Sequence, residues 1–127
     1  MTRTFLPLLA LALAGCRGET PPLEMATTPE KSRAALNTAF DAWKAGTTVA
    51  ALSARSPAVY LLDDSFAKGS KLIDYRIEGE PKVVGIGMTY IATLTLQDGA
   101  KAPATRKLAY RVVTDPTIAI SREEGTP

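Results

Sequence analysis

The chain of 127 residues contains no histidine. Histidine is the side chain whose ordinary pKa lies nearest to neutrality, and it is the commonest metal ligand in proteins. Its absence excludes His-dependent catalytic triads, His general bases and His-ligated zinc sites. No nucleophile paired with a base stands out among the other residues. We therefore expect no catalytic residue, no resident metal and no cofactor.

Cysteine is almost as scarce, since Cys16 is the only one. A single cysteine permits no disulfide within the chain, so the fold must be stabilised by its apolar core. An excess of either charge is also lacking, because 15 basic residues stand against 13 acidic ones. A nucleic-acid interface needs clustered basic residues, and the near balance argues against such a partner.

An export signal begins the chain. Arg3 precedes an uncharged run, 5–14, that is rich in Leu and Ala. A signal h-region is about 7–15 residues long and a transmembrane helix needs about 20, so this run is too short to span a bilayer. The small residues Ala14 and Gly15 then fit a peptidase cleft. A secretory signal of this kind predicts a domain outside the cytoplasm.

The tetrapeptide Leu13-Ala14-Gly15-Cys16 resembles the lipobox of bacterial lipoproteins. The resemblance implies cleavage before Cys16, a diacylglycerol on its sulfur and an acyl chain such as palmitate on its amine. Each buried methylene contributes about 0.8 kcal/mol, so two or three chains on one residue make release from the membrane very slow. An ordinary signal peptide is the alternative. An Asp directly after the lipidated cysteine favours retention in the inner membrane of Gram-negative bacteria. This chain has Arg17 at that position. We therefore expect an anchor in the outer membrane, with the domain in the periplasm or at the surface.

The segment after the anchor is expected to be a flexible tether, because Gly18, Pro21 and Pro22 disfavour helix and strand pairing. Ten extended residues reach at most about 33 Å, enough to lift a domain clear of the headgroups. The predicted organisation is a removed signal peptide, a lipidated cysteine with its tether, one α+β domain and a polar tail, with the bounds 1–15, 16–27, 28–124 and 125–127.

Helical signals dominate the first part of the domain. Thr27-Thr28-Pro29-Glu30 is a helix-start signature, and apolar residues then recur at spacings of three and four up to Gly46. A second, short helix is expected after Thr48 and cannot continue past Pro57. The apolar run 59–62 is expected in the sheet or at its edge. We expect 63–69 to be a loop with Phe66 buried.

The second part of the domain alternates apolar and polar residues with the period of a β-strand. The pattern predicts that Ile73, Tyr75 and Ile77 face inward, and that Gly85 and Gly87 permit a bend in a long strand. The strands are expected at 72–78, 82–96, 106–113 and 117–121, with turns at 79–81, 97–99 and 114–116. The predicted fold is α+β, a long N-terminal helix and a short second helix packed on a meandering antiparallel sheet of about four strands.

This order of elements is similar to that of small bacterial lipoproteins whose fold resembles the cystatin-like or nuclear-transport-factor-2-like roll. The segments that carry the resemblance are Phe40-Asp41-Ala42-Trp43-Lys44-Ala45-Gly46, Asp74-Tyr75, Lys82-Val83-Val84-Gly85 and Ile120-Ser121-Arg122-Glu123. Enzymes of that roll, such as ketosteroid isomerases and polyketide cyclases, place Asp or His inside the cone. The resemblance therefore implies an alternative function as an isomerase- or cyclase-like enzyme with a buried carboxylate and tyrosine. Asp74 is the candidate base, although it falls on the opposite side of its strand from Tyr75.

Three tyrosines, Tyr75, Tyr90 and Tyr110, share the expected inner face of the sheet. They could line a cleft for a small apolar ligand, with hydroxyls aimed inward. Core tyrosines with hydrogen-bonded hydroxyls are the commoner arrangement and the alternative interpretation. Asp63 and Asp64 could bind a hard cation, but no EF-hand spacing surrounds them and a solvated turn is favoured.

The leading functional hypothesis is a non-catalytic domain held to the envelope by lipid at Cys16. We expect it to bind an envelope protein or a small apolar ligand at its sheet or helix face, and not to bind nucleic acid. The alternatives are the isomerase- or cyclase-like enzyme and a structural or assembly role in the envelope.

Overall fold

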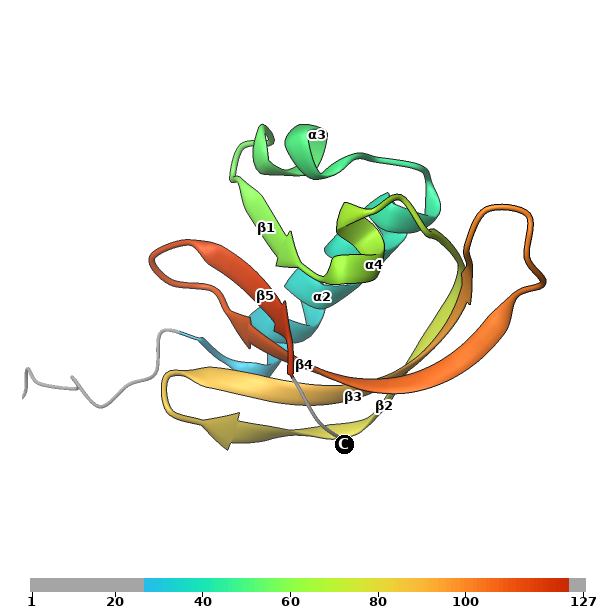
Figure 1. Cartoon of the computed structure of the whole chain (residues 1–127). Coiled ribbons are helices and arrows are strands. Elements are labelled where there is room, and N and C mark those ends of the chain that lie inside the picture. The colour runs from blue at the N-terminus through green and yellow to red at the C-terminus, as the bar shows by residue number, and fades with distance from the viewer. Residues whose placement is uncertain (1–26, 124–127) are drawn as a thin grey trace, which may run out of the picture.

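The computed structural model describes residues 27–123. A five-stranded sheet curls around one long helix, α2, and two short helices, α3 and α4, lie beside it (Figure 1). The predicted class is confirmed: the chain is α+β, with an N-terminal helix and a short helix packed on a sheet. The predictions for Cys16, for residues 17–26 and for residues 124–127 fall outside the described residues.

Helix α2 (Pro29–Lys44) begins and ends where the sequence predicts. The side chain of Thr28 accepts a hydrogen bond from the backbone N–H of Lys31 at 3.2 Å, which satisfies one of the free donors of the first turn. At the other end, Gly46 takes a left-handed conformation with φ of 92°, as a glycine after a helix commonly does. Helix α3 (Val49–Ser53) is capped by Thr48 in the same way.

The sheet has the strand order β1-β5-β4-β3-β2. Its strands are β1 (Val59–Leu62), β2 (Lys71–Val84), β3 (Gly87–Gln97), β4 (Ala104–Val113) and β5 (Ile118–Arg122). The last four form the predicted antiparallel meander. Strand β1 adds a fifth member and pairs parallel with β5, so the sheet is mixed. Local alternation could not specify this pairing, because β1 is only four residues long and its partner lies far along the chain.

The first turn of the meander lies elsewhere than predicted. Strand β2 runs through 79–81 with a register irregularity between Glu78 and Lys82, and the chain reverses at Gly85 and Ile86. Gly79 and Gly85 both have positive φ, of 59° and 62°. The sequence therefore offers two places where the backbone can turn, and the ladder resumes after the first.

A second irregularity changes which residues of β2 face the core. The register shifts between Leu72 and Asp74, which leaves Ile73 in a bulge. Leu72 is buried instead, and Ile73 is 41% exposed, so the predicted inward position of Ile73 is wrong. After the bulge, Tyr75 and Ile77 pack against the core as predicted.

The loop expected at 63–69 contains a single helical turn, α4 (Asp64–Ala67), and its aromatic residue Phe66 is buried as predicted. The core lies between α2 and the concave face of the sheet, with Phe40 at its centre. The ring of Phe40 lies 4.9 Å from that of Tyr75 and 5.1 Å from that of Tyr110, between ring centroids. Such tilted and edge-to-face pairs are the favoured aromatic geometries.

Replacing Phe40 with leucine should lower the free energy of unfolding by about 1–3 kcal/mol, because the fully buried ring joins α2 to two strands. Ile86→Ala is the matched control at an exposed apolar position and should change stability by no more than about 0.5 kcal/mol. Urea unfolding followed by circular dichroism measures both. Equal effects of the two substitutions would contradict this assignment of the core.

Candidate functional site

The three tyrosines lie on the inner face of the sheet, as predicted, although Tyr75 pairs with Leu94 and is therefore displaced along the strands from the other two. Tyr75, Tyr90 and Tyr110 come from β2, β3 and β4, and Tyr90 is the direct cross-strand partner of Tyr110. Tyr90 and Tyr110 are fully buried, and Tyr75 is partly buried. The structure therefore brings the three side chains together beneath α2.

Each of these hydroxyls has a partner within the protein. The Tyr90 hydroxyl lies 2.6 Å from Ser32 Oγ and donates to the carbonyl of Pro29 at 3.1 Å. The Tyr75 hydroxyl donates to Asp41 Oδ1 at 2.7 Å. Burial, together with this hydrogen bond and the charge of Asp41, raises the pKa of Tyr75 above its usual range. The two hydroxyls fasten α2 to the sheet, which is the core-tyrosine arrangement.

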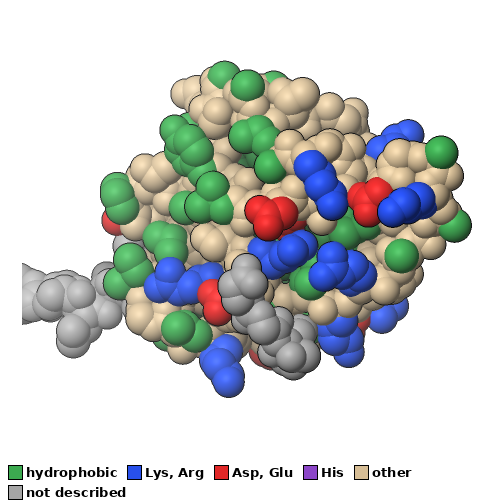
Figure 2. All heavy atoms as spheres, in the orientation of Figure 1, with side chains coloured by type: hydrophobic (Ala, Val, Ile, Leu, Met, Phe, Trp, Pro, Cys, Tyr) green, Lys and Arg blue, Asp and Glu red, His purple; other side chains and the backbone are tan. Residues whose placement is uncertain are grey.

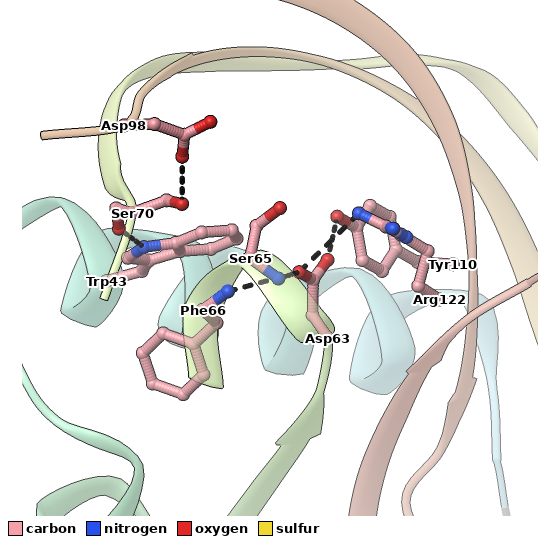
Figure 3. A network of polar contacts seen from close by, with 8 residues as sticks. All are labelled: Trp43, Asp63, Ser65, Phe66, Ser70, Asp98, Tyr110 and Arg122. Atoms are coloured by element: carbon pink, nitrogen blue, oxygen red, sulfur yellow. Dashed lines mark hydrogen bonds and ion pairs between the residues drawn. The ribbon is translucent and has the colours of Figure 1, made fainter. Parts of the chain in front are cut away.

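The third hydroxyl joins a buried polar cluster around Asp63 (Figure 3). One oxygen of Asp63 caps α4 by accepting from the backbone N–H groups of Ser65 and Phe66, at 2.7 and 3.1 Å. The other oxygen accepts from the Tyr110 hydroxyl at 2.5 Å, and Arg122 Nη1 lies 3.6 Å from the carboxylate. The side chain of Asp63 has no exposed surface, so the predicted solvated turn is wrong for Asp63, although Asp64 is exposed.

Tyr110 is a neutral donor in this cluster. Burial and the adjacent charge of Asp63 raise its pKa well above the usual range, and Arg122 opposes this shift. The neutral phenol, the capping amides and the guanidinium together compensate the buried carboxylate. The cluster ties the end of β1 to β4 and β5.

Asp74, the residue expected as the base of an isomerase-like site, lies on the surface. Its side chain is 74% exposed and its Oδ1 is 3.7 Å from Lys44 Nζ, a solvated ion pair of little energetic weight. The buried carboxylate next to a tyrosine is Asp63 instead. An aspartate at the start of a short helix is an N-cap signal, and that signal could have identified Asp63 in the sequence.

A second group of contacts in Figure 3 fixes the C-terminal end of α2. Trp43 Nε1 donates to the carbonyl of Ser70 at 2.8 Å, and the Ser70 hydroxyl donates to Asp98 in the β3–β4 turn. This hydrogen bond lowers the pKa of Asp98. Ser70 thereby links α2 to the sheet, in a structural role.

A groove runs along α2 between the helix and the start of β5, and we call it the α2 groove. It consists of two adjoining clefts, of about 430 and 290 Å³, that share Ala35, Thr38 and Ile118 as walls. The first is completed by Lys31, Ala34, Thr114 and Asp115, and the second by Arg55, Ser56, Pro57 and Val59. These volumes are near those of small-molecule sites. A separate cleft of about 350 Å³ lies at the other end of α2, beside Trp43.

Among residues 27–123, no three Cys, His, Asp or Glu side chains converge as a metal site would require. In the same part of the chain, no helix is both long and apolar enough to cross a membrane.

No family model, no curated protein and no solved structure matches this chain. The α2 groove and the Asp63 cluster must therefore be interpreted from their own chemistry.

Tyr110→Phe should lower the free energy of unfolding at neutral pH by about 1–3 kcal/mol, because a buried carboxylate loses a donor. A tyrosine whose pKa is raised by folding stabilises the fold fully below its ordinary pKa of about 10, and this contribution falls as the pH rises further. The difference between the wild type and Tyr110→Phe should therefore narrow above about pH 10.

Urea titrations at several pH values measure this difference. Tyr75→Phe is the control, since its hydroxyl bonds an exposed partner and should cost less than about 1 kcal/mol at neutral pH. If Tyr110→Phe were as stable as the wild type at neutral pH, the Asp63 cluster would not have the structural role assigned to it.

Proposed function

We propose that this protein is a lipid-anchored protein of the bacterial cell envelope whose domain binds a small apolar ligand in the α2 groove. The anchor is supported by the resemblance of Leu13-Ala14-Gly15-Cys16 to a lipobox. The observation that carries the binding function is the position and lining of the groove, which lies on the helix face of the domain.

The groove begins where the predicted tether joins the domain. Thr114, one of its walls, donates its backbone N–H to Thr27 Oγ1 at 3.0 Å, and Thr27 is the first residue that the structure describes. A ligand that leaves or enters the lipid phase would therefore meet the groove close to the anchor. The Trp43 cleft, at the other end of α2, lacks this proximity.

The lining suits an apolar molecule with an acidic group. Ala34, Ala35 and Ile118 provide apolar walls. Lys31 shares the first cleft with Asp115, whereas the lining of the second cleft contains Arg55 and no acidic residue, so Arg55 is the better placed to hold a carboxylate. We therefore take a fatty acid as the representative ligand, because apolar walls with a few placed polar groups are typical of such sites.

The interior of the sheet favours binding over catalysis. Tyr75, Tyr90 and Tyr110 lie beneath α2, and each hydroxyl is hydrogen-bonded to a protein group. Asp63, the buried carboxylate, is enclosed by a tyrosine, two amides and an arginine. An isomerase or cyclase needs its carboxylate to reach a substrate, and these contacts hold Asp63 away from solvent.

A fluorescent fatty acid tests the binding function on the purified protein. We expect saturable enhancement of its fluorescence and a rise in Tm, since a ligand at 100 times its Kd stabilises a protein by about 2.7 kcal/mol. Ala34→Trp fills the groove and should reduce affinity at least tenfold. Ala51→Trp is the control at an exposed helical alanine outside the groove. Equal binding by the two variants, or no binding by the wild type, would overturn the proposal.

Mass spectrometry of the protein purified from bacterial membranes tests the anchor separately. The expected chain begins at Cys16 and carries the added mass of a diacylglycerol and an acyl chain. Cys16→Ser should keep residues 1–15 and lack the lipid. A wild-type chain with an unmodified thiol would refute the anchor, whatever the groove binds.

A further inference from the structure

The turn between β2 and β3 is the most exposed apolar part of the described chain. Val83, Val84 and Ile86 are 57%, 40% and 65% exposed, and we call these three residues the hairpin tip. They are three of the seven large apolar side chains that are exposed in the structure, and they fall within four consecutive positions. A cluster of this kind at a turn indicates a contact surface, whereas single exposed apolar residues do not.

The apolar side chains of the tip point in more than one direction. Val83 and Val84 are neighbours in a strand, so their side chains point to opposite faces of the hairpin. Ile86 belongs to the turn itself, and the guanidinium of Arg111 lies close to Gly85 and Gly87. Apolar groups that extend in different directions, with a basic group beside them, suit insertion at the surface of a lipid bilayer.

The tip lies at the same end of the domain as the tether. Met88, just after the turn, pairs with Val112, and Thr114 follows soon after and bonds Thr27. In Figure 1 the β2–β3 turn, the β4–β5 turn and the start of α2 all lie at the left. Figure 2 shows hydrophobic side chains over this left part of the face, with Lys or Arg side chains among them as well as at the centre and right. The predicted tether, at most about 33 Å long, limits how far this end of the domain can move from the membrane.

Basic side chains stand behind the tip. Arg111 Nη2 donates to the carbonyl of Val84 at 3.2 Å, and Lys82 precedes the apolar residues. Both can extend toward phosphates while the tip lies deeper. Glu80 and Asp115 at the same end are exposed and offset these charges, so the apolar contact must carry the interaction.

We propose that the hairpin tip inserts into the boundary between headgroups and acyl chains of the membrane that holds Cys16. The proposal rests on the lipid anchor described above. Insertion fixes the orientation of the domain, with the tip and the first cleft of the α2 groove at the bilayer and the β3–β4 turn away from it.

An environment-sensitive fluorophore on a cysteine at position 86 tests this directly. The lipidated Ile86→Cys protein is reconstituted in vesicles of phosphatidylethanolamine and phosphatidylglycerol and labelled with a nitrobenzoxadiazole probe. The added cysteine is then the sole free thiol, because the sulfur of Cys16 carries the diacylglycerol. We expect emission at shorter wavelength and a loss of intensity when the acyl chains carry nitroxide quenchers. Ala100→Cys, in the exposed β3–β4 turn, is the matched control and should show neither effect.

The possible outcomes separate this proposal from the anchor. If the probe at 86 stays in water while mass spectrometry finds Cys16 acylated, insertion is refuted and the anchor stands. Quenching at both 86 and 100 would refute the proposed orientation. If the probe at position 86 emitted at shorter wavelength but was not quenched by lipid nitroxides, the tip would be in contact with protein, such as a second copy of the chain. That outcome would also refute insertion. An unacylated Cys16 would overturn both proposals.

Discussion

The contact between α2 and the concave face of the sheet determines this structure. The chain can form no internal disulfide, so the association of one helix with one sheet must hold the domain. Phe40 is central to it because its ring touches aromatic residues from two strands and from its own helix. The sheet bends around α2 (Figure 1), so the buried face of this one helix covers the inner face of the sheet.

Polar groups give this apolar contact its precise arrangement. Tyr90 is bonded to the first turn of α2, Tyr75 is bonded to Asp41 near its C-terminal end, and Trp43 reaches from its last turn to Ser70. Apolar packing alone is not directional, whereas these hydrogen bonds fix where the helix lies along the sheet. In the same way, Asp63 fixes the end of β1 to β4 and β5 through its contacts with Tyr110 and Arg122. The buried polar groups therefore have structural roles, and the surfaces for which we propose a function are the α2 groove and the hairpin tip.

Local signals in the sequence predicted the elements well and their long-range assembly less well. The caps at Thr28 and Thr48 and the inward positions of Tyr90 and Tyr110 follow from short-range patterns, and the structure agrees with them. The bulge at Ile73 and the displaced turn at Gly85 depend on pairing with β3, which periodicity within one strand does not contain. The N-cap position of Asp63 is a local signal, whereas its burial depends on contacts such as that with Tyr110, 47 residues away. The α2 groove forms between segments distant in the chain, so no single motif marks it.

The parallel pairing of β1 with β5 has a consequence for the order of folding. Strand β5 lies between β1 and β4, so an inner position of the sheet is filled by the strand that comes last along the described residues. A nascent chain that still lacks residues 118–122 has neither the partner of β1 nor Arg122 beside Asp63. The mixed sheet can therefore be completed only after residues 118–122 have been added, although β1 is its first strand in the chain.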